Sequence, residues 1–386
     1  MSTPVKQIKL SNVLTEIIDK TEEDGKYRVL TSSQSGIVSQ EEYFNKKVAS
    51  RDTSGYKIIR KGQFTYRAMS DTGRFYINRL DDFDIGIVSP AYPVFEIKDN
   101  NEVSSDYLTA FFKSEKFQSD IAHMYTGSTR SSLKFKNLRD VVINVPDKEE
   151  QKKRLNVLRI IDRELSILGE IENKLDDSVK SRFIEMFGDP EAGEGKYELQ
   201  KLRDLSVKIS DGVHAKPEYT SEGRPFLSVV NINKGVVDFE NCKYVSEEAY
   251  QKMIKSTCPE KGDVLYTKVG ATYGIPAYID TEREFCLYVS VCLIKPKHEM
   301  INSRFLAIQM GMPSIKHQAD ARIKGIGVPD LHLNQIGEFD IICPPRNMQD
   351  DFVSFVDSID KSKLAVQEMK NKMEILKASV MQEYFC

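Results

Sequence analysis

Few residues in this sequence have the types and spacing of a catalytic site. Asp84 and the run Glu96-Ile97-Lys98 come nearest, because a nuclease can use two carboxylates to hold Mg²⁺ and a lysine to orient a water molecule. The spacing is loose, and the matching segment of the second half, VCLIKPK (291–297), keeps the lysine without a carboxylate. The pattern therefore does not favour nuclease chemistry.

Motifs for cofactor, phosphate and metal binding are also missing. GDVLYTKVGATYG (262–274) has glycines but lacks the Gly-Lys-Ser/Thr of a phosphate loop, and no G-x-G-x-x-G opens a helix after a strand. There is no Asn/Asp-Pro-Pro-aromatic tetrapeptide of the kind that holds a flipped base in an amino-methyltransferase. His214 and His332 are single loop histidines, and the six cysteines form no C-x-x-C pair. We expect no catalytic residue, no metal site and reduced cysteines that pack.

Several polar loops have compositions that suit DNA. Residues 125–138 and 321–331 combine small residues with basic ones, so such loops can approach a phosphate backbone or place a guanidinium on guanine. The loops at 31–36, 210–219 and 267–274 carry side chains suited to base edges and phosphates. The predicted DNA-contacting residues are Ser33, Gln34, Tyr66, Arg67, Arg74, Arg130, Lys134, His214, Lys216, Lys268, Tyr273, Arg322 and Lys324. Each loop has the alternative reading of a solvated surface loop, so the prediction rests on the regions more than on single residues.

These loops belong to two similar halves. Residues 146–188 lie over residues 344–386 without a gap after a shift of 198. The matched pairs include Pro146/Pro344, Gln151/Gln349, Asp162/Asp360, Glu170/Glu368, Asn173/Asn371, Ser181/Ser379, Glu185/Glu383 and Phe187/Phe385. Upstream, RKGQFTYR (60–67) resembles EKGDVLYT (260–267), and IKLSNV (8–13) resembles QKLRDL (200–205). Each half is a variable globular domain followed by a similar helix.

The two repeated segments predict long helices with a narrow apolar seam. The seam residues are Leu158, Ile161, Leu165, Leu168, Leu175 and Val179 in the first copy, and Phe352, Val356, Ile359, Val366, Met373, Leu376 and Val380 in the second. Such a seam needs a partner helix. Each rod of about 37 residues is roughly 55 Å long, and we expect the two to pack antiparallel as a coiled coil. An αα pair inside one large domain is the alternative, but the polar faces are wide.

The predicted layout alternates domains with helices. Gly188 supplies a left-handed helix end and Pro190 prevents continuation. Short apolar runs and one helix near the end of each half, at 104–124 and 302–321, indicate α+β domains. The predicted boundaries are 1–146 for the first domain, 147–188 for the first helix, 189–199 for a linker, 200–344 for the second domain and 345–386 for the second helix.

The composition limits how the chain could meet nucleic acid. The net charge of -3 and a pI of about 6.1 argue against a protein that coats DNA through a broad basic field. Contacts would come from loops, helped by a more basic partner. No run of about 18 apolar residues and no apolar signal core are present, so we expect a cytoplasmic protein.

Over essentially its whole length the chain resembles the DNA-specificity subunit of type I restriction-modification systems. The resemblance rests on the twofold layout, on KGDVLYTKVGATYG (261–274), on the helix entries PDKEEQ (146–151) and PPRNMQ (344–349), and on the helix exit FIEMFGDP (183–190). The first half departs from it, with KGQFTYRAMSDTG at 61–73. We interpret this departure as divergence toward a different DNA half-site.

The resemblance implies a function and a set of partners. Each domain would be a target-recognition domain for one half of a split, asymmetric site in double-stranded DNA. The helix pair would set the gap between the halves, with roughly 16 base pairs as its upper bound, and dock two adenine methyltransferase subunits. The chain itself would have no catalytic residues. S-adenosylmethionine would be used by the methyltransferase, and ATP and Mg²⁺ by partner subunits that include a restriction and translocase subunit.

Two other classes of function stay open at this point. A coiled-coil scaffold without a DNA role predicts no sequence-dependent binding, even beside a methyltransferase. A stand-alone nuclease or methyltransferase predicts activity of the purified chain with Mg²⁺ or S-adenosylmethionine.

Overall fold

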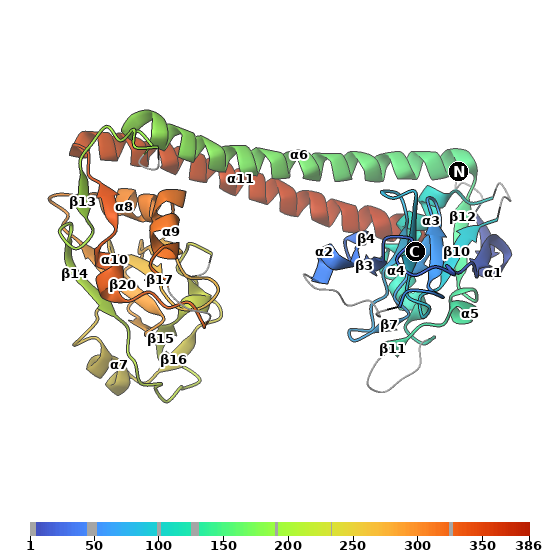
Figure 1. The fold of residues 1–386 in the computed structure, drawn as a ribbon, viewed down its shortest axis with the longest axis horizontal. Helices are drawn as coiled ribbons and strands as arrows, with labels where there is room; N and C mark the ends of the chain where they lie inside the picture. Colours follow the sequence, from blue (N-terminus) through green and yellow to red (C-terminus); the bar gives the residue numbers. More distant parts are fainter. Residues whose placement is uncertain are drawn as a thin grey trace. The chain divides into compact units, whose positions relative to one another are not determined.

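The computed structural model describes residues 5–44, 52–98, 102–124, 131–189, 192–232, 234–323 and 327–386. The chain divides into two compact units, one made of Met1–Gly169 with Gln367–Cys386 and the other of Glu170–Val366. Each unit contains one α+β domain and part of two long helices, α6 (Lys148–Phe187) and α11 (Arg346–Phe385) (Figure 1). The described helices include none that is both long and apolar enough to cross a membrane.

The first domain is built on an antiparallel sheet with strand order β2-β10-β6-β8. Its strands are β2 (Leu14–Ile17), β10 (Val94–Ile97), β6 (Phe64–Tyr66) and β8 (Ile77–Arg79). Four further strand pairs are β1 (Val5–Lys9) with β12 (Val142–Pro146), β3 (Leu30–Ser33) with β4 (Gly36–Ser39), β5 (Lys57–Arg60) with β9 (Ile85–Val88), and β7 (Met69–Ser70) with β11 (Ser131–Ser132). The helices are α1 (Leu10–Val13), α2 (Gln40–Phe44), α3 (Ser105–Phe112), α4 (Glu115–Ile121) and α5 (Phe135–Leu138).

The second domain repeats this plan with the sheet order β14-β20-β17-β18. Its strands are β14 (Ser206–Asp211), β20 (Val291–Pro296), β17 (Val264–Thr267) and β18 (Pro276–Tyr278), with β13 (Leu199–Lys201) paired to β21 (Asp340–Ile342). A second sheet joins β16 (Lys243–Val245), β15 (Arg224–Leu227) and β19 (Cys286–Leu287). The helices are η1 (Val229–Asn231), α7 (Glu247–Met253), α8 (Ser303–Met310), α9 (Pro313–Asp320) and α10 (Leu333–Gly337).

The helix expected near the end of each domain is in fact two helices, so that prediction was wrong in detail. In the first domain Ser114 interrupts it, because its hydroxyl accepts the Phe117 N–H at 3.1 Å and caps α4. In the second domain Pro313 begins α9, since proline fits the first turn of a helix but not its interior. The corresponding pairs are α3–α4 and α8–α9.

The helices α6 and α11 run antiparallel in each unit. In the first unit Arg154 Nη1 donates to the Tyr384 carbonyl at 2.6 Å, and Lys377 lies 2.6 Å from Asp162. In the second unit the Phe183 and Phe352 rings pack at 5.6 Å. These contacts confirm the predicted antiparallel pair (Figure 1).

The predicted seam contains one error. Leu158, Ile161 and Val366 are buried, but Leu376 is 47% exposed. The neighbouring Lys377 pairs with Asp162 across the helices at 2.6 Å, and both side chains stay partly exposed.

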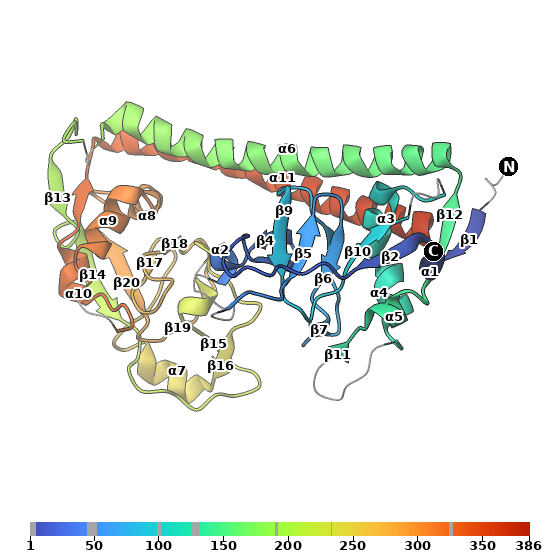
Figure 2. The same ribbon diagram turned by 45° about the vertical axis from the view of Figure 1, so that its right-hand side comes forward.

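Each long helix ends with a phenylalanine in the core of a domain. Phe385 packs against Tyr107 and Phe111 of α3, at 5.1 and 5.8 Å between ring centroids. Figure 2 shows the end of α11 beside α3. Phe187 packs on Phe305 of α8 at 5.3 Å in the second domain. The helix that leaves the first domain therefore completes the core of the second, and the last helix completes the core of the first.

Gly188 ends α6 as predicted. Its φ of 84° is left-handed, and a Cβ at this position would lie 2.1 Å from the Glu194 carbonyl oxygen. The Lys196 N–H donates to the Phe187 carbonyl at 3.0 Å, which turns the chain back on the helix end. Pro190 lies outside the described residues.

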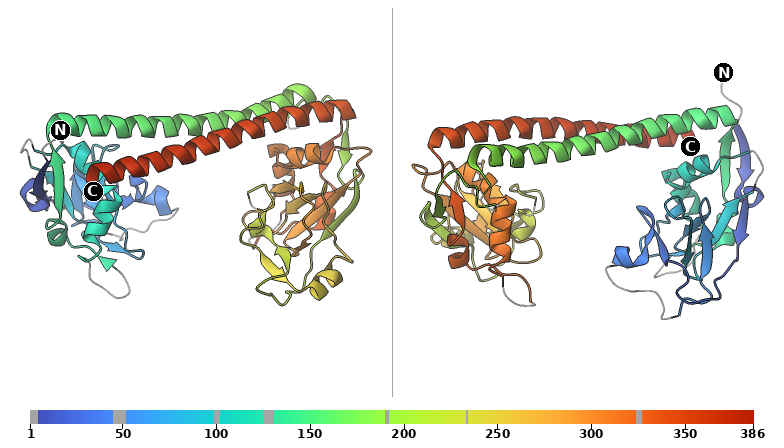
Figure 3. Two further views of the ribbon diagram at one scale, coloured as in Figure 1. Left: turned by 180° about the vertical axis from the view of Figure 1, so that it is seen from behind. Right: turned by 45° about the horizontal axis from the view of Figure 1, so that its top comes forward.

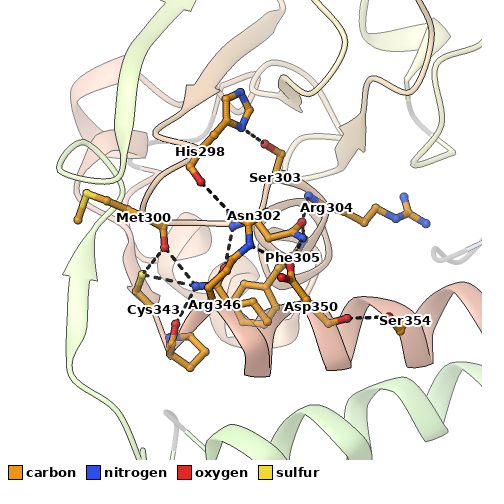
Figure 4. Close-up of polar contacts among 12 residues, drawn as sticks. His298, Met300, Asn302, Ser303, Arg304, Phe305, Cys343, Arg346, Asp350 and Ser354 are labelled. Carbon is orange, nitrogen blue, oxygen red and sulfur yellow. Dashed lines mark hydrogen bonds and ion pairs between the residues drawn. The ribbon is translucent and has the colours of Figure 1, made fainter.

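A buried glutamine fixes the start of each long helix to its domain. Gln349 accepts the Asn302 N–H at 2.7 Å and donates to the carbonyls of Met300 and Pro344 at 3.2 and 2.7 Å. Figure 4 shows this junction, where Asn302 also donates to Asp350 at 2.8 Å. Asn302 caps the start of α8, and Figure 3 shows the orange helices of the second domain next to the end of α6 and the start of α11.

Gln151 makes the same three bonds in the first domain. It accepts the Ser104 N–H at 2.9 Å and donates to the carbonyls of Glu102 and Pro146 at 2.8 and 2.9 Å. All four residues match those of the second junction after the shift of 198. The repeat is therefore a repeat of contacts as well as of sequence.

Candidate nucleic-acid interface

One predicted loop of the first domain, 125–138, meets the segment of two further predicted residues through one short strand pair. Ser70 and Met69 of β7 pair with Ser131 and Ser132 of β11. The Leu133 N–H then donates to the Ala68 carbonyl at 3.0 Å. This pairing brings the segment that carries Arg67 and Arg74 to the segment that carries Lys134.

Three basic side chains are exposed around this pairing, namely those of Arg67, Arg74 and Lys134. Arg74 forms an ion pair with Glu115 of α4, which holds it at the surface. Lys134 precedes α5, where it occupies the N-cap position. Arg130 lies outside the described residues.

The hairpin β3–β4 offers a second polar tip in the first domain. Ser33 is buried, and the Asn78 amide donates to its carbonyl at 2.8 Å, so it cannot face DNA in this conformation. The next residue, Gln34, is exposed in the turn. The predicted contact at Ser33 is thus corrected to a structural role, because its own backbone positions the turn.

Tyr66 is also a correction. It is fully buried in the core, its hydroxyl donates to the Leu133 carbonyl at 3.1 Å, and burial raises its pKa. Alternation along β6 placed the aromatic ring inside. The side chain ties the sheet to the segment 131–134 from beneath and is not available to a base.

Four segments of the second domain converge in the same way. The Gly270 N–H donates to the Pro329 carbonyl at 2.9 Å, and the Leu331 N–H to the Lys268 carbonyl at 2.9 Å. The Lys268 N–H donates to the Ser290 carbonyl at 3.0 Å, and Val213 exchanges bonds with the segment 287–289. We call the segments 211–216, 267–270, 287–290 and 327–331 the loop cluster.

Two basic residues that were predicted to contact DNA, one in this cluster and one outside it, are held by contacts within the protein. Lys268 is only 4% exposed and lies between two carboxylates. Arg322 donates to the carbonyls of Gln318 and Glu338 at 2.7 and 3.1 Å, so its guanidinium is committed to the protein. Lysine and arginine are rarely buried unless paired, so sequence pattern alone favoured an exposed position for both.

Tyr273 is half-buried, and its hydroxyl and ring both contact neighbouring side chains. Its hydroxyl donates to Asp320, and the Lys316 ammonium lies 3.6 Å from the centre of its ring. The hydrogen bonds from Lys316 and from this hydroxyl lower the pKa of Asp320. Lys324 lies outside the described residues.

A basic and aromatic patch beside the loop cluster was only partly predicted. His214 and Lys216 are exposed, as expected. Lys216 and Lys243 flank the ring of Tyr219, at 5.8 and 4.3 Å from its centre. Tyr219 ends the predicted loop 210–219 but was not singled out, and Lys243 was missed. The two lie 24 residues apart, and strand pairing in the sheet of β15 and β16 brings them together.

Asp84 and Glu96, the two carboxylates weighed for a nuclease site, belong to no group of three or more potential metal-ligating side chains in the part of the chain that the structure describes. Asp84 lies 3.7 Å from Lys61, Glu96 accepts a bond from Gln63 at 3.0 Å, and Lys98 donates to the Ser11 carbonyl at 3.3 Å. Each of the three is satisfied by a different neighbour. The arrangement does not offer a shared metal site.

Comparisons with known proteins agree with this fold. The model of the type I restriction modification DNA specificity domain matches twice, at residues 9–177 and 196–377. These matches cover most of the chain, which therefore belongs to this family. The type I restriction enzyme MjaIX specificity subunit of Methanocaldococcus jannaschii is 24% identical over 282 residues, which are 66% of this chain and 62% of the relative.

Two solved structures share the architecture over the whole chain. The type I restriction-modification S subunit from M. genitalium has a TM-score of 0.51 at 15% identity, over 100% of this chain and 97% of its own. A chain from a study of complex assembly and conformational transition of the type I system has a TM-score of 0.64 at 14% identity, over 100% and 98%. At these identities the likeness shows the fold.

Proposed function

We propose that this chain is the subunit that reads DNA for a type I restriction-modification complex. The first domain would read one half of a split site through the segments around β7 and β11 and the β3–β4 turn. The second would read the other half through the loop cluster and the basic and aromatic patch. Exposed Arg, Lys, Gln and His side chains on these segments supply contacts to phosphates and base edges.

One observation carries this proposal: the junctions between domain and helix are the same in the two halves, whereas the polar loops differ. The junctions around Gln151 and Gln349 are the same contact for contact. The polar loops on the two sheets differ in residue type and in contacts. A single reader of two different half-sites needs this combination.

The partners would dock on the helices and supply the chemistry. Two methyltransferase subunits would bind S-adenosylmethionine and flip the adenine, and a restriction and translocase subunit would use ATP and Mg²⁺. With α6 and α11 each 40 residues long, a rod of about 60 Å would set the gap between half-sites.

A domain exchange tests the proposal. Residues 196–344 are replaced by the matching domain of another family member, and the complete complex is expressed in a host that lacks other methylation. Methylation-sensitive sequencing should show one half of the motif changed and the other half and the gap retained. A scaffold would leave no methylated motif that depends on this chain, and a change in both halves or in neither would contradict modular reading.

A further inference from the structure

The loop cluster of the second domain is tied together by one buried lysine. Lys268 follows β17, and its ammonium lies 3.5 Å from Asp211 Oδ1 and 3.6 Å from Asp330 Oδ1. Asp211 ends β14, and Asp330 stands in the segment before α10. A single side chain thus links three segments that are far apart in the sequence.

The charged and polar groups around this lysine are buried, and burying them costs free energy. Its side chain is 6% exposed and that of Asp211 16%. Among the described residues, Asp211 Oδ1 and the Ser210 hydroxyl have no hydrogen-bond partner. Burial raises the pKa of Asp211, and the charge of Lys268 opposes that rise. A buried ion pair such as that of Lys268 with Asp211 is weak evidence of a stabilising role, because apolar residues of similar size often stabilise a core as well.

The first domain shows that the fold itself does not need the lysine. Ala68 takes the same place, because the Leu133 N–H bonds to its carbonyl as the Leu331 N–H bonds to that of Lys268. The backbone frame is equal in the two domains. The charge is therefore specific to the loops of the second domain.

The segment that Asp211 anchors carries the exposed side chains. Gly212 lies so close to β19 that a Cβ would approach the Leu287 carbonyl oxygen to 2.2 Å. His214 and Lys216 follow directly on the outer surface. On the other side, the bond from Gly270 to Pro329 fixes the third segment.

We propose that Lys268 is a positioning residue for DNA reading by the second domain. Lys268 does not touch DNA itself. It holds the segments around Asp211 and Asp330 in one arrangement, so that the exposed side chains of these segments meet base edges. This inference rests on the proposed function and adds that one half-site depends on an internal ion pair.

The test uses the complete complex and a library of sites with single base changes in each half. Lys268→Met should lower base discrimination about tenfold or more in one half only, the scale of one lost base contact. Lys268→Arg should restore part of it, since it keeps the charge. Lys252→Met removes an exposed lysine on α7 and should change nothing.

Asp330→Asn gives a second variant that keeps the pair between Lys268 and Asp211 and removes only the ion pair to the third segment, whose backbone bonds stay in place. It should relax discrimination in the same half by a smaller factor, with the thermal unfolding of the complex unchanged. Unchanged discrimination in Lys268→Met or in Asp330→Asn would overturn the inference. So would a uniform loss of affinity for all sites with a salt slope reduced by about one, because that result marks a phosphate contact. If the wild type itself methylates no split motif, the proposed function fails instead.

Discussion

Gln151 and Gln349 lie 198 residues apart and make the same three hydrogen bonds, whereas Ala68 and Lys268 hold the same place in their sheets and share only a backbone bond. The first pair belongs to the joint between domain and helix. The second belongs to the polar loops. The contacts that position each domain on its helix are thus the same in the two halves, while the contacts that shape the polar surface differ.

The turn before the central strand belongs to the equal part. Gly62 donates to the Leu80 carbonyl at 2.8 Å, and Gly262 to the Ile279 carbonyl at 2.9 Å. The next residue is Gln63 in one domain and Asp263 in the other, and each accepts the N–H three residues earlier at 2.9 Å. The KGQ and KGD motifs are therefore structural turns, where either an amide or a carboxylate oxygen serves.

We expect the largest loss of stability when the buried glutamines that join each domain to its helix are replaced. Gln151→Ala and Gln349→Ala each remove three hydrogen bonds between a buried side chain and the backbone, which should cost about 3–6 kcal/mol of domain stability. Hydrogen exchange should rise in α3 for the first variant and in α8 for the second. Gln367→Ala on the exposed face of α11 is the control. A cost below about 1 kcal/mol would contradict a shared joint.

The terminal aromatic residues come next. Phe385→Ala should destabilise the first domain and Phe187→Ala the second, each by about 3–5 kcal/mol, because each leaves a cavity in an aromatic core. Denaturant unfolding followed by exchange at α3 and α8 measures both. Ile375→Ala, 71% exposed, should change stability by less than about 0.5 kcal/mol. Full protection of α3 in Phe385→Ala would show that the first core does not need the last helix.

We expect a smaller loss of stability, of the same size in both domains, when the turn glycines are replaced. Gly62 and Gly262 have φ values of 86° and 94°, so alanine at either should cost about 1–2 kcal/mol. Gly169→Ala in α6 has open space for a Cβ and should stabilise by up to about 1 kcal/mol. Thermal unfolding of the three variants shows whether each substitution stabilises or destabilises the protein. Unequal costs at the two turns would break the equivalence of the motifs.

The smallest expected effect concerns an ion pair between domain and long helix in which the acidic and basic residues exchange places from one half to the other. Asp106 of α3 pairs with Arg159 of α6, and at the matching positions Arg304 of α8 lies 3.8 Å from Asp357 of α11. Arg159→Gln and Asp357→Asn should each cost below about 1 kcal/mol, because the pairs are partly exposed. Urea unfolding at low and high salt should show the cost disappear as salt screens the charges. A cost that persists in 1 M salt would indicate packing rather than charge.

Much of the frame was predictable from local patterns. The shift of 198, the helix periodicity and Gly188 depend on neighbouring residues, so the α+β domains and the long antiparallel helices followed from sequence. The break at Ser114 was missed because a capping hydroxyl looks the same as any helix serine until its hydrogen bond is seen.

The polar surface was predicted less well. Regions around β7, β11 and the loop cluster do come together, but Ser33, Tyr66 and Lys268 are buried, and the Arg322 guanidinium is bonded to two carbonyls of the protein. A lysine or arginine in a glycine-rich loop has the same local signal whether it faces solvent or a buried carboxylate. The partner that decides between the two, such as Asp330 for Lys268, lies 62 residues away.

The sequence by itself determined that this chain is a duplicated protein with two domains and two paired helices, because repetition and periodicity are properties of the order of residues. Only the tertiary structure decided that each helix ends in the core of a domain and that Lys268 is internal. Those outcomes depend on burial, and burial depends on which distant segments pack against a residue.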